Sequence, residues 1–149
     1  MDQTRSIDLL NRLFQVHYRS LPVYAQGTRP WTPPEQEKAL EALAAVAADQ
    51  KRTAAHIAEA IQQQRGRLEP GQFPIAFTGI HDVSAEFVLR RAAELQDRDL
   101  KIIRECAAQL AAVPQWRPLA EETLRQAQTH QEMLAEGMRG EGRGMREEG

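Results

Sequence analysis

Cysteine is almost absent from this sequence of 149 residues, which contains only Cys106. A single thiol forms neither an internal disulfide nor a cysteine-rich zinc site, so both of these stabilising devices are excluded. The same shortage is typical of proteins from a reducing compartment, and we predict a cytoplasmic location. A chain of this length is expected to fold as one domain around a hydrophobic core of its own.

Neither sign of charge is in clear excess, because 19 lysines and arginines stand against 21 aspartates and glutamates. Proteins that bind nucleic acid or anionic membranes generally carry a marked basic excess, so the composition argues against both partners. Long apolar runs are missing as well. The N-terminal stretch MDQTRSIDLL is polar and leads into an amphipathic pattern, which predicts neither a signal peptide nor a membrane span.

No stretch alternates between apolar and polar residues as a half-buried strand does, whereas helical periodicity recurs along the chain. The expected helices cover residues 5–25, 33–64, 82–112 and 116–136. Thr4 or Ser6 is expected to cap the first helix, and Pro22 to bend or end it. The second starts with the capping box Thr32-Pro33-Pro34-Glu35, which places proline at the first helical position.

The connections between these helices differ greatly in length. Residues 66–82, GRLEPGQFPIAFTGIHD, are long for a loop but contain apolar side chains, so we expect a crossover that packs on the helices. Pro114 marks a short turn between the last two helices. This order predicts an all-α protein, a four-helix bundle with one long crossover connection, in a domain of residues 1–138. Residues 139–149 are glycine and charge without a core pattern and predict a disordered tail.

The order of these segments resembles the ferritin-like superfamily over roughly residues 5–136. In that superfamily a glutamate on each of the first and third helices joins a Glu-x-x-His pair on each of the second and fourth, and together they bind two irons in the core. On this chain the resemblance puts His17 at the position of the glutamate on the first helix. It puts Gln50 to Thr53 at the Glu-x-x-His pair of the second helix, and Ala127 to His130 at that of the fourth. Only His130 keeps the expected residue type.

The third predicted helix offers two carboxylates for the remaining position. Glu94 is nearer to the spacing of the superfamily, but it faces away from the apolar stripe, whereas Asp99 lies at the centre of that stripe. We therefore choose Asp99. It lies about as far before the turn at Pro114 as His130 lies after it, so the two side chains are expected to be buried within hydrogen-bond reach of each other.

The inward face of each helix can be computed because a helix turns about 100° per residue. The polar residues that fall within the apolar arcs are His17, Gln50, Thr53, Asp99 and His130. Asp49 and His56 fall on the opposite side of their helix from Gln50, and we expect both of them at the solvated surface. Each predicted helix thus contributes at least one polar side chain to the core.

A di-iron site needs several carboxylates, because a bridged iron pair requires anionic oxygen ligands. The inward set offers one carboxylate and two imidazoles, so we expect neither di-iron oxidase chemistry nor iron storage. One interpretation is a buried hydrogen-bonded network without a cofactor, in which Asp99 accepts from a histidine and Gln50 and Thr53 complete the layer. The protein would then be a non-catalytic helical module that acts through assembly or partner binding.

The alternative is a single iron, zinc or manganese ion held by His17, Asp99 and His130, with Gln50 and Thr53 in support. Two histidines and a carboxylate with open positions suit iron(II), and the same set can take zinc or manganese. The protein would then be a mononuclear metal protein, with an oxidoreductase among the options. A cavity for a small ligand or haem is a third interpretation.

The third predicted helix is apolar over more of its circumference than one core face requires. Its second apolar row consists of Leu89, Ala93, Leu100, Ile103 and Ala107. The first helix likewise adds Leu9 and Val16 beyond its core face. The crossover can cover only part of these rows, so we predict a two-fold homodimer that buries one of them.

Overall fold

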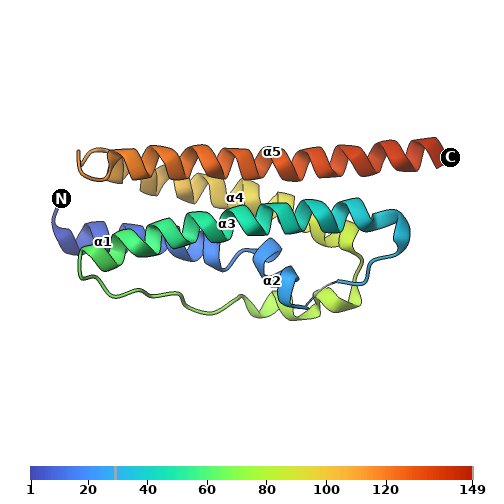
Figure 1. Ribbon diagram of the computed structural model, residues 1–149, viewed down its shortest axis with the longest axis horizontal. Helices are drawn as coiled ribbons and strands as arrows, with labels where there is room; N and C mark the ends of the chain where they lie inside the picture. The colour runs from blue at the N-terminus through green and yellow to red at the C-terminus, as the bar shows by residue number, and fades with distance from the viewer. Residues whose placement is uncertain (29, 149) are drawn as a thin grey trace.

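The structure, a computed structural model, describes the backbone of residues 1–28 and 30–148, and the side chains of these residues except 81, 82 and 140–148. Its regular elements in this part of the chain are all helical (Figure 1), which confirms the predicted all-α class. In chain order they are α1 (Gln3–Tyr18), α2 (Leu21–Thr28), the 3-10 helix η1 (Pro34–Gln36), α3 (Glu37–Gln63), the 3-10 helix η2 (Ile75–Asp82), α4 (Ala85–Ala111) and α5 (Arg117–Glu148).

The helices α1, α3, α4 and α5 lie side by side along the long axis of the molecule (Figure 1). The colours of Figure 1 show that α1 and α5 run in one direction, and that α3 and α4 run in the other. A short turn joins the antiparallel neighbours α4 and α5. Because α3 and α4 are parallel, their connection at residues 64–84 has to return along the length of the molecule, as the sequence predicted.

The buried apolar side chains form two clusters, one toward each end of the helices. The first includes Leu10, Leu13, Ile57, Ile61, Ile103 and Leu110. The second includes Leu21, Leu43, Val46, Val88, Leu89 and Leu134. Burying one such side chain contributes about 1.5–3 kcal/mol, so these clusters supply most of the driving force for folding. Along each helix, the change from one cluster to the other falls at buried polar residues.

The first helix predicted from the sequence, residues 5–25, is two helices that meet at Ser20. Pro22 lacks a backbone N–H and disfavours helical geometry in the residue before it, so the chain breaks there. The Ser20 hydroxyl accepts a hydrogen bond from the Val23 backbone N–H at 3.3 Å and so helps to begin α2. Because of this break, Ser20 is buried in the centre of the molecule.

Predicted helix starts were wrong by a few residues, because other side chains satisfy the free N–H groups. Asp2, in place of Thr4 or Ser6, caps α1 by accepting from the Arg5 N–H at 2.8 Å. In α4, Ser84 accepts from the Phe87 N–H at 3.2 Å, so the helix begins at Ala85 after the predicted Asp82.

The predicted capping box at residues 32–35 was also wrong. Thr32 donates its hydroxyl hydrogen bond to the Pro30 carbonyl at 2.9 Å, within the loop. The segment after it forms η1, and α3 begins only at Glu37 without a side-chain cap.

The crossover lies along α1 and is fixed there by side chains one turn apart. The Asn11 amide donates to the Arg67 carbonyl at 2.9 Å, and Gln15 donates to the Glu69 carbonyl at 2.7 Å. Asn11 also accepts from the backbone N–H of Glu69 at 2.8 Å. These bonds satisfy backbone groups of an extended segment that has no helix or sheet of its own. This part of the crossover therefore covers α1.

The apolar rows on which the homodimer prediction rested are mostly buried within a single chain, although Ala93 and Val16 are only half-buried. Leu89, Leu100, Ile103 and Ala107 are buried, and so is Leu9 on α1. In contrast, Asp99, which was expected at the centre of the apolar stripe, is only half-buried, and so are Leu95 and Ile102 on either side of it. The inward face of α4 is therefore rotated from the predicted one, and the argument for a dimer interface fails. The homodimer itself stays an untested prediction.

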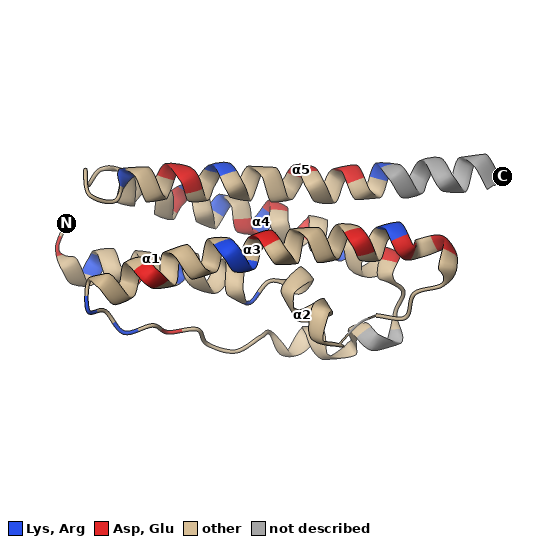
Figure 2. Ribbon diagram, viewed as in Figure 1, with Lys and Arg blue, Asp and Glu red and all other residues tan. Residues whose placement is uncertain are grey.

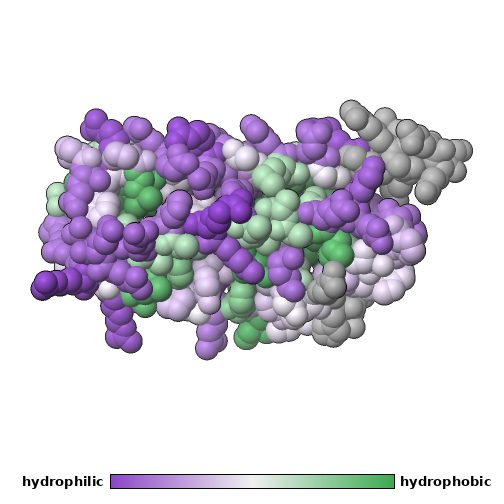
Figure 3. Space-filling view, in the orientation of Figure 1, coloured by the Kyte–Doolittle hydropathy of each residue, from purple (hydrophilic) through white to green (hydrophobic). Residues whose placement is uncertain are grey.

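Charged residues of both signs are interspersed over the outward faces of the helices (Figure 2). Hydrophilic side chains cover much of the face in Figure 3, with apolar patches between them. Over the described residues, no helix combines the length and the apolar character needed to cross a membrane. The predicted disordered tail, residues 139–149, falls almost entirely on residues whose side chains are not described, and it stays a prediction.

Candidate functional site

A chain of hydrogen bonds crosses the centre of the molecule between the two apolar clusters. The Ser20 hydroxyl donates to Gln50 Oε1 at 2.5 Å, and Gln50 Nε2 donates to Gln96 Oε1 at 3.4 Å. Gln96 Nε2 in turn donates to the Ala127 carbonyl at 3.0 Å. The three side chains are buried, and they link the start of α2 to α3, α4 and α5. A chain of neutral donors and acceptors satisfies itself without any buried charge.

Gln96 is the polar residue that α4 places in the core, and the sequence interpretation missed it. We chose Asp99, three residues later, which shifts the computed face by about 60°. The signal that could have found Gln96 is its position four residues from both Ala92 and Leu100, each of which is buried. A polar residue flanked in this way lies on the midline of a wide apolar arc.

His130 is fully buried, as predicted, but its carboxylate partner is Asp49 and not Asp99. Its Nε2 lies 2.5 Å from Asp49 Oδ2. Asp49 also accepts from the Arg52 guanidinium at 2.9 Å, and its side chain is 24% exposed. The prediction that Asp49 is a solvated surface residue was therefore wrong, whereas His56 is exposed as predicted. Asp49 sits at the rim of α3 and reaches across to α5.

The protonation of this pair follows from its surroundings. Burial acts to raise the pKa of Asp49, but hydrogen bonds from Arg52 and His130 outweigh it and hold that pKa below its ordinary value. Burial lowers the pKa of His130, against the opposing effect of the Asp49 hydrogen bond and charge. His130 is therefore neutral at pH 7, with the Nε2 hydrogen donated to Asp49 and a lone pair left on Nδ1.

His17 on α1 has the complementary arrangement. Its Nδ1 lies 2.8 Å from the Leu13 carbonyl, which can only accept, so Nδ1 donates and Nε2 carries the lone pair. Burial lowers the pKa of His17 to about 4, despite the hydrogen bond to Leu13. The ring centroids of His17 and His130 are 6.0 Å apart at an interplanar angle of 71°.

Two buried lone pairs thus occur on neighbouring rings. His17 Nε2 and His130 Nδ1 have no hydrogen-bond partner among the described protein atoms. Acceptors of this kind can be satisfied by one donor with two hydrogens, such as a water molecule, or by one metal ion. The carboxylate behind His130 is the kind of support that metal-bound histidines usually have.

Thr53 is buried at the edge of the same layer, as predicted. Its hydroxyl lies 3.1 Å from the Asp49 carbonyl and also contacts the Gln126 side chain. A hydroxyl carries one hydrogen and cannot donate to both oxygens at once. Its role is therefore to fill the corner between α3 and α5 beneath the Asp49–His130 pair.

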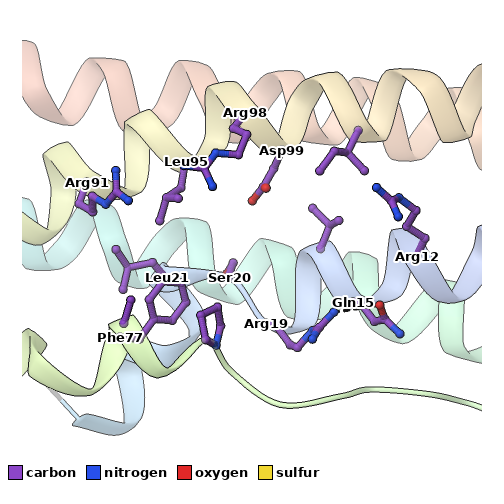
Figure 4. A pocket seen from close by; sticks show the side chains of 14 residues that line it. Arg12, Gln15, Arg19, Ser20, Leu21, Phe77, Arg91, Leu95, Arg98 and Asp99 are labelled. Atoms are coloured by element: carbon purple, nitrogen blue, oxygen red, sulfur yellow. Dashed lines mark hydrogen bonds between the residues drawn. The ribbon is translucent and has the colours of Figure 1, made fainter.

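Asp99 lies apart from the histidines, in a groove of about 410 Å³ between α1 and α4 (Figure 4). Burial raises the pKa of its carboxyl to about 6, against the opposing charge of Arg98. Of the predicted ligand set, the structure brings His17 and His130 together and leaves Asp99 out. Across the described residues, no group of three or more histidine, cysteine, aspartate or glutamate side chains is arranged to hold a metal ion.

The chain matches no protein-family model, no curated protein and no solved structure with which it was compared.

Proposed function

We propose that the protein is a four-helix bundle of ferritin-like layout that has lost its di-iron site and acts by binding rather than by catalysis. Two features of the fold support this layout: α1 and α5 run against α3 and α4, and one long crossover joins the parallel pair. The polar residues also lie at one level of the core, where the superfamily holds its metals.

The observation that carries the proposal is the neutral chain from Ser20 through Gln50 to Gln96. Iron pairs need anionic oxygen ligands, and these positions supply amide and hydroxyl groups instead. The amides already form hydrogen bonds with Ser20, with each other and with the Ala127 carbonyl. The layer is therefore suited to fixing how the helices fit together, and it is poorly suited to holding two cations.

A role in binding is favoured by large apolar side chains at the surface. Trp31 is 66% exposed, Ile75 86% and Phe87 49%. Trp31 lies beside the start of α4, because its carbonyl accepts from the Ala85 N–H, and Phe87 is in the first turn of that helix. Exposed apolar groups near one another, as Trp31 and Phe87 are, mark contact sites for a partner more often than isolated ones do.

Elemental analysis of protein purified without chelator tests the proposal. We expect well under one iron, zinc or manganese per chain, because the core has no set of anionic ligands. Stoichiometric metal in protein from metal-sufficient medium would contradict it.

A second candidate function is a single-metal protein, and the unpartnered nitrogens of His17 and His130 favour it. If metal is found, His17→Ala and His130→Ala should each remove it. His56→Ala is the matched control, because His56 is exposed and should leave the metal content unchanged. Metal that persists in both core variants would exclude this candidate as well.

A further inference from the structure

The groove that contains Asp99 is a second feature that the core does not explain. It lies between α1 and α4, with Leu21 and Phe77 at one end and Arg12 at the other (Figure 4). Its volume of about 410 Å³ is within the range of about 300–1,000 Å³ of small-molecule sites. The crossover borders it through Pro74 and Ala76.

Arginines line both walls of the groove. Arg12 and Arg19 come from the α1 side, and Arg91 and Arg98 from α4 (Figure 4). Arg91 is paired with Glu94 at 2.9 Å, whereas the partners of Arg19 among the described residues are neutral acceptors, Gln15 Oε1 and the Gln72 carbonyl.

Among the described residues that line the groove, Asp99 is the acidic one, so the walls carry an excess of positive charge. This contrasts with the chain as a whole, whose formal net charge is −2. A local excess of guanidinium groups in an acidic protein attracts anions to that place.

Apolar side chains lie between the arginines. Val16, Leu95 and Ile102 are half-buried and face the groove. Guanidinium groups bind carboxylate or phosphate with paired hydrogen bonds, and they stack on apolar surface more readily than ammonium groups. A groove lined by both arginines and apolar side chains fits a ligand that has an anionic part and an apolar part.

We propose that this groove binds a small amphipathic anion, in which a carboxylate or phosphate monoester head contacts the arginines and an aliphatic tail lies on Val16, Leu95 and Ile102. The proposal goes beyond the binding role argued above, because the exposed apolar residues Trp31 and Phe87 do not line this groove. A protein partner is less well matched, because the hollow is small and bordered on one side by the crossover.

The ionisation of Asp99 should make the affinity for an anion depend on pH. Arg12, Arg19, Arg91 and Arg98 line the same groove, and of these the charge of Arg98 acts on the pKa of Asp99. Its pKa of about 6 means that it is mostly ionised at pH 7 and mostly neutral at pH 5. A bound anion raises that pKa further, so affinity should increase as the pH falls from 7.5 to 5.5.

Calorimetric titration tests the proposal with decanoate and decyl phosphate, both below their micelle concentrations. We expect saturable one-to-one binding of at least one of them, which also distinguishes the two head groups. Acetate, inorganic phosphate and decanol should each bind at least about tenfold more weakly, since each lacks the head or the tail.

Substitutions of single arginines test whether the ligand binds in the groove. Arg12→Gln and Arg98→Gln should each weaken binding by about tenfold, the size of one charged contact. Arg90→Gln and Arg104→Gln are matched controls on the exposed side of α4 and should change nothing. Asp99→Asn should bind more tightly than the wild type at pH 7.5 and lose the pH dependence.

Absence of saturable binding, decanol bound as tightly as decanoate, or equal effects of groove and control arginines would each overturn the proposal. Failure here is distinct from failure of the proposed function. If the protein contains no metal and binds neither decanoate nor decyl phosphate, the groove proposal is wrong and the proposed function stands. If the protein contains stoichiometric metal and binds either of them, the proposal of a core without metal is wrong and the groove proposal stands.

Discussion

Replacing both Gln50 and Gln96 with glutamate is expected to destabilise the protein at pH 7 on the order of 4 kcal/mol. The two amides are buried and in contact at 3.4 Å. Burial and mutual repulsion raise carboxyl pKa values by about 3 units or more, and each unit corresponds to about 1.4 kcal/mol. Chemical denaturation measures the loss, and Gln62→Glu on the exposed side of α3 is the control.

The pH dependence of this double variant has a defined sign. A carboxyl whose folded pKa is raised costs stability above its unfolded pKa of about 4.3, where the unfolded chain is ionised. The variant should therefore recover part of its loss relative to the wild type as the pH falls from 7 toward 4.5. Added iron(II) or manganese(II) should also stabilise it and not the wild type, because two carboxylates would then be buried in the layer that contains His17 and His130. A double variant as stable as the wild type at pH 7 would show that the two side chains do not share a buried site.

Protonation of His17 is expected to remove about 3 kcal/mol of the stability of the wild-type protein between pH 6.5 and pH 4. The unfolded chain binds a proton at His17 below pH 6.5, whereas the folded chain resists protonation down to about pH 4. Stability from this source is complete above pH 6.5 and declines as the pH falls. His130 acts in the same direction, and Asp49 contributes only at lower pH, below its ordinary pKa. Asp99 acts in the opposite direction, because its pKa is raised to about 6, so the contribution of His17 is the difference between the wild type and a His17 variant.

Denaturation midpoints across this range check the prediction with two variants. His17→Asn keeps a donor for the Leu13 carbonyl. It should lower the free energy of unfolding at pH 7 and make that free energy fall less steeply between pH 6.5 and pH 4. His56→Asn, at an exposed position, should follow the wild type. If His17→Asn loses as much stability as the wild type between pH 6.5 and pH 4, the pKa of His17 is not lowered in the folded state.

The features predicted correctly are those that depend on local sequence. The helical periodicity, the short turn at Pro114 and the long crossover follow from residue spacing, and together they confirm the all-α class. His17 and His130 were found because each stands alone in a narrow apolar stripe. Gln50 and Thr53 are buried as well, as their place on the apolar arc predicted.

The failures come from geometry that spacing does not contain. Asp99 was preferred to Gln96 because the apolar arc of α4 is wide, and only its neighbours fix which part of the arc faces inward. Asp49 was placed outside, although a short carboxylate at the rim of one helix can reach a histidine on the next. Ser20 was missed because the break before Pro22, which turns its hydroxyl inward, was not resolved into two helices.

The aerobic oxidation of iron(II) by the purified protein tests the central claim most directly, namely that the core layer is neutral and has no di-iron chemistry. We expect iron(II) to disappear at the rate measured in protein-free buffer at every ratio of iron to protein. Fast oxidation that scales with protein concentration and saturates near two irons per chain would contradict it.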